Sequence, residues 1–239
     1  MVRFSLIFSI LSYFFLFEME PTRKPRVKIC CIGSRDEAMM AIRYGASAIG
    51  LVSAMPSGPG VIPEDLIAAI APIVPPGVSS FLLTSKRDAN SIIDQQRRLR
   101  VSALQLVDSV PPDLYRQLRS ALPGIALVQV IHVRGTEAID EACSVAPHVN
   151  ALLLDSGNPM LAVKELGGTG RTHDWNTSRK IRELVSIPVY LAGGLTPENV
   201  SGAIDAVSPF GLDVCSGVRT GGVLDERKLS LFFAQVNAR

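Results

Sequence analysis

Short apolar runs alternate with amphipathic segments from residue 27 to the end of the chain. Each apolar run ends at a turn residue or a polar residue, which is typical of buried strands. The amphipathic segments between them open on Ser, Thr, Asp or Pro, the residues that commonly begin helices. The pattern predicts strands at residues 27–32, 47–52, 78–83, 101–107, 125–133, 149–155, 187–192 and 210–216.

The strict alternation of strand and helix predicts a mostly parallel sheet covered by helices. Eight evenly spaced strands, with a last helix near residues 226–236, are typical of an α/β protein built as a single (β/α)8 TIM barrel. A doubly wound sheet is the alternative. It is disfavoured because no G-x-G-x-x-G motif follows the first strand.

Residues 1–24 stand outside this alternation. One arginine precedes a mostly apolar stretch from Phe4 to Phe17, which is shorter than the roughly 20 residues of a membrane-spanning helix. The stretch has the length of a signal-peptide core, but no small-residue cleavage site follows it. A signal or anchor segment is one interpretation, and a true translation start at Met19 is the other. We therefore treat 1–24 as an N-terminal extension and assign the barrel to residues 25–239.

Composition narrows the class of ligand. The 24 basic and 22 acidic residues are interspersed, so no basic stripe indicates nucleic-acid binding, and a small ligand is expected. The four cysteines and three histidines show no metal-ligand spacing, which predicts no metal and no cofactor. Few, irregularly spaced cysteines fit reduced thiols in a cytoplasmic protein.

In a barrel of this kind, the chemistry lies at the carboxyl ends of the strands. Two glycine turns follow the last two strands, LAGGLTPENV and CSGVRTGG, where barrels often bind phosphate through backbone N–H groups. The alternative is that these glycines only turn the chain. Two such turns in adjacent loops favour a phosphate site, whose candidate donors are Gly193, Gly194, Ser216 and Gly217.

An acid and a thiol stand at other strand ends. Asp155 closes the run NALLLD, where partial burial would raise its pKa and make it a proton donor; capping the next loop is the alternative. Strand alternation directs Cys30 into the barrel and Cys31 outward, to pack against the helices with Ile29. Cys30 could be a base or nucleophile, or inert filling.

Lys28 has the same parity as Cys30 and so is expected inside the barrel. A buried ammonium needs a partner. Asp213 lies on the strand that neighbours the first one in a closed barrel, and it also points inward. We therefore predict a Lys28–Asp213 ion pair beneath the site.

These pieces together resemble the phosphoribosylanthranilate isomerase family of tryptophan biosynthesis. The matching segments occur in the family's order from residue 27 to residue 223. They are VKICCI, DEAMMAIRYGASAIGLV, the QL of Gln105 and Leu106, LLLDS, GGTGRTHDW, PVYLAGGLTPENV and GLDVCSGV. The most specific combination is GGTG-x-x-x-DW with LAGGL-x-PENV.

The resemblance implies an Amadori rearrangement of an N-linked phosphoribosylamine to a 1-amino-1-deoxyribulose phosphate, without metal or cofactor. It assigns Asp155 as the general acid that opens the ribose ring and Cys30 as the base that removes the C2′ proton. The glycine-rich loop at residues 164–175 suits a lid over the ligand, with Gly168 as a candidate substrate contact. Asp213 and Arg219 are further candidate contacts at the mouth.

Three departures from the family pattern bear on the substrate. Residues 53–62 contain no basic residue where the family carries an arginine for the anthranilate carboxylate, and Arg219, Arg171 and Arg134 are candidate replacements. The chain has QLVD where the family usually has QLHG, and Arg219 replaces a glutamate. Apart from these three departures, Cys31 stands next to the candidate base where the family has glycine. A paralogue acting on another phosphoribosylamine and a non-catalytic phosphosugar-binding barrel therefore remain alternatives. The sequence does not decide between a monomer and a homodimer.

Overall fold

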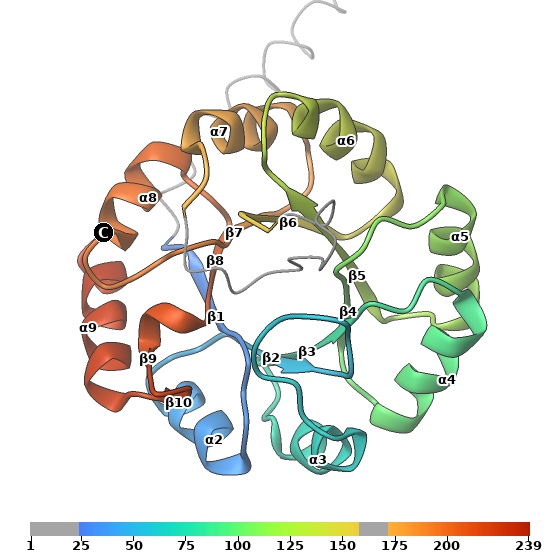
Figure 1. Cartoon of the computed structure of the whole chain (residues 1–239), viewed down its shortest axis with the longest axis horizontal. Helices are drawn as coiled ribbons and strands as arrows, with labels where there is room; N and C mark the ends of the chain where they lie inside the picture. Colours follow the sequence, from blue (N-terminus) through green and yellow to red (C-terminus); the bar gives the residue numbers. More distant parts are fainter. Residues whose placement is uncertain (1–23, 158–171) are drawn as a thin grey trace, which may run out of the picture.

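A barrel of parallel strands forms the centre of the molecule, with helices around it (Figure 1). The structure is a computed structural model that describes residues 24–157 and 172–239. Strands pair in sequence order, and β8 pairs back with β1, so the sheet is closed. The strands are β1 (Arg26–Ile29), β2 (Ala48–Val52), β3 (Ser79–Thr84), β4 (Ala103–Leu106), β5 (Ala126–His132), β6 (Ala151–Asp155), β7 (Val189–Leu191) and β8 (Gly211–Val214).

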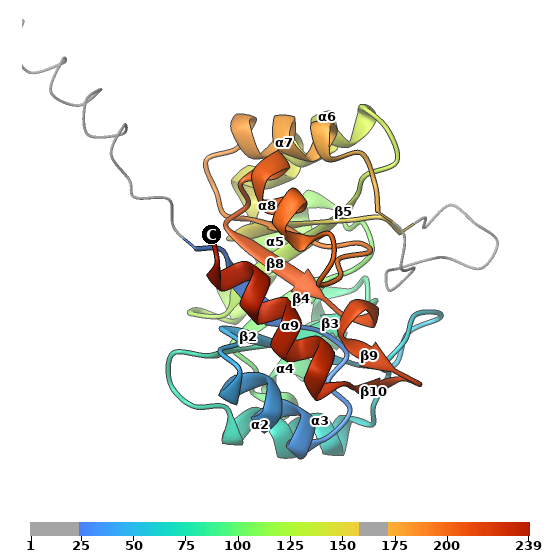
Figure 2. The ribbon, with the colours of Figure 1, turned by 90° about the vertical axis from the view of Figure 1, so that its left-hand side faces the viewer.

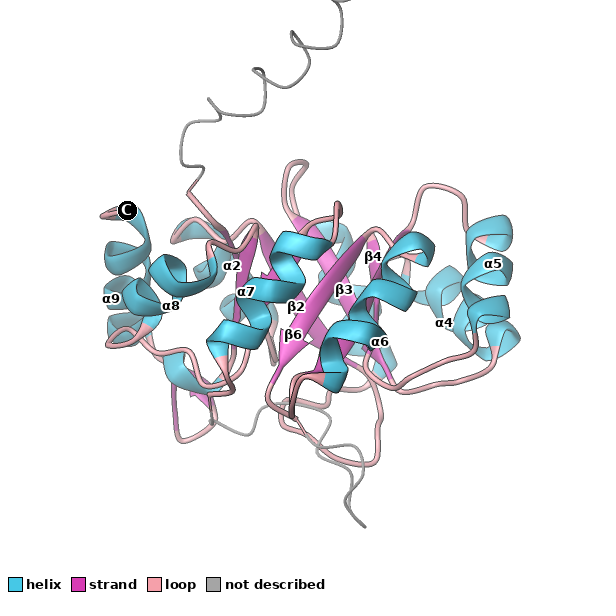
Figure 3. Ribbon diagram, turned by 90° about the horizontal axis from the view of Figure 1, so that it is seen from above, coloured by secondary structure: helices cyan, strands magenta, loops and turns pink. Residues whose placement is uncertain are grey.

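The predicted (β/α)8 barrel is therefore confirmed, and its helices form the outer ring (Figure 3). Side-chain caps explain where several helices begin. Ser34 accepts a hydrogen bond from the Glu37 N–H, and Asp225 caps the last helix in the same way. The helices are α2 (Arg35–Arg43), α3 (Glu64–Ile70), α4 (Ala89–Leu99), α5 (Pro112–Ala121), α6 (Glu137–Val145), α7 (Trp175–Leu184), α8 (Val200–Val207) and α9 (Glu226–Asn237), with 3-10 turns η2 (Ala71–Ile73), η3 (Ala146–His148) and η4 (Ser216–Val218).

Strand alternation divides the core into two layers. One set of strand side chains, including Ile29 and Leu104, packs against the helices, where Phe232 of α9 is fully buried. The other set fills the barrel interior, where Phe81 and Tyr190 make an edge-to-face contact. The interior is thus a packed core, and a cavity lined by Cys30 and Asp155 lies at the carboxyl ends of the strands.

A short antiparallel hairpin, unexpected from the hydrophobic pattern, follows β8. Strands β9 (Arg219–Thr220) and β10 (Val223–Leu224) are joined by Gly221 and Gly222, both at positive φ, as a two-residue hairpin turn requires. Figure 2 shows this hairpin at the end of the barrel opposite the C-terminus. It therefore lies at the mouth, beside the loop that follows β1.

The N-terminal extension and most of the predicted lid fall outside the described residues. Gly168 and Arg171 belong to that part of the chain. Within residues 24–157 and 172–239, no helix has the combined length and apolar character that a membrane crossing requires.

Candidate active site

The predicted ion pair forms the floor of the site. Lys28 and Asp213 are partners in the register of β1 and β8, and the Lys28 Nζ lies 2.8 Å from the Asp213 Oδ1. Lys28 is completely buried, with its ammonium over the Phe81 ring. Burial acts to lower the pKa of Lys28, but the Asp213 carboxylate, with smaller contributions from Cys30 and Cys31, more than offsets it, so that pKa lies above its ordinary value. The lysine is therefore a fixed positive charge below the cavity.

Cys30 lies directly above this pair and lines the cavity at the barrel mouth, as the alternation predicted. Its backbone N–H continues the ladder to β8 by donating to the Val214 carbonyl at 2.9 Å. The neighbouring Cys31 thiol lowers the pKa of Cys30; Lys28 adds to this effect, while burial and Asp213 oppose it. The net shift is downward, which favours the thiolate that a base requires.

Asp155 ends β6 and lines the same cavity. It is 6% exposed, and its Oδ1 accepts a hydrogen bond from the Ser156 N–H at 2.8 Å. Its pKa is raised from 3.8 to about 6, mainly by burial and in smaller part by the nearby Asp213, while the Ser156 bond and Lys28 act in the opposite direction. The carboxyl is thus adjusted toward holding a proton near neutral pH, as a general acid must.

The predicted outward direction of Cys31 is wrong. β1 ends at Ile29, and Cys31 has a φ of 61°, so the strict alternation of a strand no longer applies to it. Its side chain turns into the cavity, where its thiol lies 3.6 Å from the Pro59 carbonyl oxygen. Glycine adopts this left-handed conformation without cost, whereas a cysteine adopts it only rarely.

The two predicted phosphate loops lie side by side. Gly193, Gly194 and Ser216 line the cavity, and both glycines have positive φ, at 82° and 62°. Gly217 does not line the cavity. It lies against the preceding loop, where an added Cβ would collide with the Leu195 carbonyl oxygen. The candidate phosphate residues are therefore brought together, with Gly217 providing the close approach of the loops.

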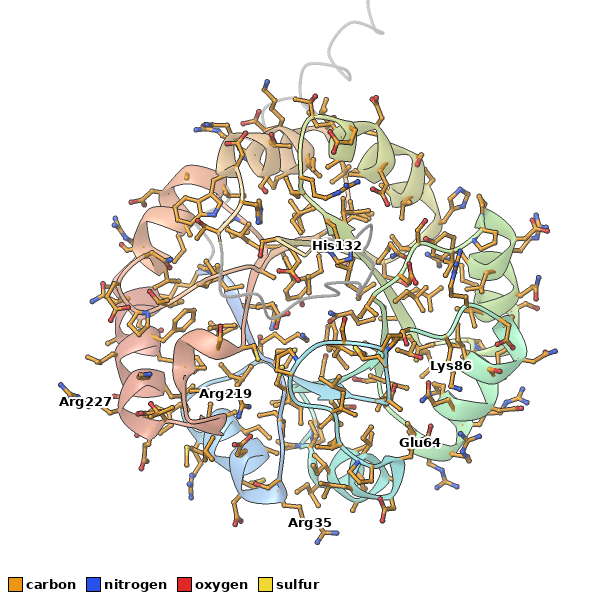
Figure 4. All side chains as sticks on the ribbon, in the orientation of Figure 1. Arg35, Glu64, Lys86, His132, Arg219 and Arg227 are labelled. Atoms are coloured by element: carbon orange, nitrogen blue, oxygen red, sulfur yellow. The ribbon has the colours of Figure 1, made fainter. Side chains whose placement is uncertain are left out.

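Arg219 is not placed to bind the substrate. Its guanidinium forms an ion pair with Glu37, with NH1–Oε1 and NH2–Oε2 both at 3.0 Å, and donates to the backbone carbonyls of Cys30 and Cys31 at 3.2 and 2.6 Å. Figure 4 shows Arg219 among the elements beside β9, while Arg35 and Arg227 point out from the helical ring. The guanidinium therefore fastens the loop after β1 to the hairpin, and its charge is already paired.

One site residue escaped the sequence reasoning as a contact. Gln105 of β4 lines the cavity, is 3% exposed, and its Oε1 has no hydrogen-bond partner among the described residues. A buried unpaired carbonyl oxygen is costly, so this atom is a ready acceptor for a ligand donor. Gln105 lies two residues after Ala103 on β4, so strand alternation alone could have predicted that its side chain points into the barrel.

The cavity wall beyond Gln105 is apolar. It is formed by Val52, Met55, Pro59 and Leu83, and the described lining residues include no arginine or lysine. Arg134 is exposed and does not line the cavity.

His132, at the end of β5, uses its Nε2 in a 3.1 Å bond with the Val107 carbonyl (Figure 4). Burial lowers the pKa of its ring, which favours the neutral form. A neutral imidazole adds no cation to the mouth. The described wall therefore offers no positive partner for a substrate carboxylate.

Comparison with known proteins identifies this arrangement. The family model described as N-(5'phosphoribosyl)anthranilate (PRA) isomerase matches residues 28–235. The N-(5'-phosphoribosyl)anthranilate isomerase of Methanocella arvoryzae is 38% identical over 81% of this chain and 88% of its own. The second such isomerase of Methanosarcina mazei is 38% identical over 87% and 92%.

Solved structures agree. The phosphoribosyl anthranilate isomerase of Thermotoga maritima superposes with a TM-score of 0.78, 29% identity, and coverage of 90% of this chain and all of the other. A phosphoribosyl anthranilate isomerase in complex with reduced 1-(o-carboxyphenylamino)-1-deoxyribulose 5-phosphate superposes with a TM-score of 0.75, 27% identity and the same coverage. The chain belongs to the N-(5'-phosphoribosyl)anthranilate isomerase family.

Proposed function

We propose that this protein catalyses the Amadori rearrangement of N-(5'-phosphoribosyl)anthranilate to 1-(o-carboxyphenylamino)-1-deoxyribulose 5-phosphate. The observation that carries the proposal is that Cys30 and Asp155 line one cavity beside the two glycine loops. Family membership supports the reaction, and the opposite pKa shifts of the two groups support their roles. A general acid and a general base of opposed protonation state are what the rearrangement needs.

In the first step, Asp155 donates its proton to the ribose ring oxygen. The C1′–O bond breaks, the amine lone pair forms the C1′=N bond, and the ring opens to a protonated imine. The Cys30 thiolate then removes the C2′ proton, and the electron pair of that C–H bond moves into the C1′–C2′ bond to give an enol-amine. Tautomerisation of the C2′ hydroxyl to a ketone, with protonation at C1′, completes the reaction.

Gly193, Gly194 and Ser216 are the proposed phosphate contacts, with backbone N–H groups as donors. Gln105 is a proposed acceptor for a substrate N–H or hydroxyl group, because its Oε1 is buried and unpaired among the described residues. The Lys28–Asp213 pair supports both functional groups from below. We also propose that the protein acts in the cytoplasm, as a monomer or a homodimer.

The test uses substrate generated in situ from anthranilate and phosphoribosyl pyrophosphate, with loss of anthranilate-type fluorescence as the readout. Turnover by the wild type, abolished in both Cys30→Ala and Asp155→Asn, is the expected result. Binding of the reduced product analogue without turnover would indicate a non-catalytic phosphosugar-binding barrel instead. Full turnover in either variant would overturn the assigned roles.

A second candidate, a paralogue for another phosphoribosylamine, is favoured by the apolar wall of Val52, Met55, Pro59 and Leu83. A charge-assisted bond to a carboxylate contributes about 1.5–3 kcal/mol, so its loss lowers preference for anthranilate by roughly ten- to a hundredfold. The comparison of kcat/KM for N-(5'-phosphoribosyl)anthranilate and N-(5'-phosphoribosyl)aniline separates the two functions. A higher value for the aniline compound identifies the paralogue.

A further inference from the structure

Three thiols line the cavity of the candidate active site. Cys30, Cys31 and Cys215 all face it, and all three are free. The rearrangement proposed above needs one thiolate, so the other two thiols take no part in its proton transfers. No group of three His, Cys, Asp or Glu side chains in the described ranges is arranged to hold a metal ion.

The strand register brings Cys30 and Cys215 opposite each other. Lys28 pairs with Asp213 and Ile29 with Val214, and the Cys30 N–H donates to the Val214 carbonyl at 2.9 Å, so Cys30 and Cys215 are the two residues that directly follow the last pair of this ladder. Neighbouring strands lie about 4.8 Å apart where the ladder ends, within the Cα separation of about 4.4–6.8 Å that a disulfide accepts. Both side chains belong to the interior layer of the barrel, on the same side of the sheet.

Cys31 is less suited to bond with Cys30. Consecutive Cα atoms are about 3.8 Å apart, which is shorter than an ordinary disulfide allows. The Cys31 side chain instead interacts with both other thiols, while its own S–H donates to the Pro59 carbonyl. Cys215 and Cys30 together with burial raise the pKa of Cys31, whereas the Cys31 contact lowers the pKa of Cys30, so Cys30 forms the thiolate more readily than Cys31.

The backbone around the cluster is held firmly. Arg219 donates to the carbonyl oxygens of both Cys30 and Cys31, and Glu37 fixes that guanidinium by two contacts of 3.0 Å. Cys30 and Cys31 are 5% and 6% exposed, and Cys215 is half-buried at the mouth. A small oxidant entering the open cavity therefore meets three adjacent thiols on a fixed frame.

We propose that this cluster is an oxidative modification site, in which a peroxide converts Cys30 to a sulfenic acid that Cys215 resolves as a Cys30–Cys215 disulfide. In the first step the Cys30 thiolate attacks one peroxide oxygen, the O–O bond breaks, and hydroxide leaves. In the second, the Cys215 sulfur attacks the Cys30 sulfur, and the hydroxyl leaves as water with the thiol proton. The peroxide is reduced, and the two thiols are oxidised by two electrons.

The modification has a functional consequence that rests on the proposed function. A disulfide removes the sulfur that serves as the base, so turnover stops, and a dithiol reductant restores it. Oxidation beyond the sulfenic acid is irreversible, and a nearby resolving thiol protects against it. Cys215 thus gives the catalytic thiol a reversible oxidised state.

Mass spectrometry tests the bond independently of activity. In a Cys143→Ser background, which removes an exposed cysteine remote from the cavity, the full-length protein is treated with hydrogen peroxide and its free thiols are alkylated. Trypsin then releases residues 29–35, with Cys30 and Cys31, and residues 183–219, with Cys215. We expect these two peptides to be joined, with the loss of two hydrogens, and activity to fall in proportion to the joined fraction.

Two variants identify the bonded sulfur. The cross-link is expected to persist at end point in Cys31→Gly and to disappear in Cys215→Ser, with circular dichroism confirming that both are folded. A cross-link lost in Cys31→Gly would overturn the Cys30–Cys215 assignment. Conversion of wild-type Cys30 to sulfinic acid without any cross-link would overturn the proposal. A cross-link in a protein with no isomerase activity would leave the disulfide established and refute only the proposed function.

Discussion

The ionisation of Asp155 links stability and catalysis, and its neutral isostere Asp155→Asn tests both. Burial raises the pKa of this carboxyl to about 6 in the folded protein, while the pKa of an aspartate in an unfolded chain is about 3.9. The folded state therefore binds this proton more tightly. The stabilisation is fully present below about pH 4 and is lost as the pH rises toward about 6.

The magnitude follows from the size of the shift. A rise of about two pKa units corresponds to about 3 kcal/mol of unfavourable ionisation in the folded state at pH 7 and above. Asp155→Asn cannot ionise, yet its amide oxygen can still accept the Ser156 N–H. We expect the variant to be more stable than the wild type by up to about 3 kcal/mol at pH 7.5 and nearly equal at pH 4. Its kcat should fall by roughly 10²–10⁴, because the general acid is gone.

Urea unfolding followed by circular dichroism, at half-unit steps from pH 4 to pH 8, measures the difference. The exposed Asp94 of α4 provides the matched control, since Asp94→Asn should leave the pH dependence of unfolding unchanged. Equal free energies of unfolding for wild type and Asp155→Asn across the whole pH range would refute the prediction that folding raises the pKa of Asp155. Stabilisation with unimpaired turnover would refute its role as the acid.

Three further substitutions test the support of the site. Lys28→Met leaves the Asp213 carboxylate buried without its partner and should cost about 3–5 kcal/mol in urea unfolding; full stability in that variant would contradict the buried pair. Gly217→Ala places a Cβ against the Leu195 carbonyl oxygen and pushes the two proposed phosphate loops apart, so we expect KM for the phosphorylated substrate to rise. An unchanged KM would show that the close contact of the loops is not needed for phosphate binding. Arg219→Gln loses its ion pair with Glu37 and should lower Tm by several degrees, measured by calorimetry; an unchanged Tm would show that the clamp is dispensable.

Strand periodicity predicted the barrel and much of the site, because one rule of alternation governs every residue within a strand. It correctly directed Lys28, Cys30 and Asp213 into the interior. The rule failed at Cys31, one residue past the hydrogen-bonded frame that enforces it. A single left-handed residue reverses a side chain, and a non-glycine residue with that φ leaves no mark in the hydrophobic pattern.

The ion pairs and hydrogen bonds of the site were harder to predict than the direction in which strand side chains point. Arg219 and Glu37 are separated by 182 residues, and only the closure of β8 onto β1 brings the hairpin to the start of α2. The unpaired Gln105 oxygen was equally hidden, since a glutamine in an apolar strand gives no indication of whether its amide finds a partner. Both are properties of the packed barrel.

The opposed protonation states of Cys30 and Asp155 have a common structural origin. Lys28 lies beneath the cavity and favours both anions, yet it only partly offsets the burial of Asp155, whose pKa stays raised. Cys30 differs because the neighbouring Cys31 thiol also lowers its pKa, and this effect is the largest of those acting on it. A second thiol beside the first therefore lowers the pKa of the base, while burial, only partly offset by the Ser156 N–H and Lys28, raises the pKa of the acid.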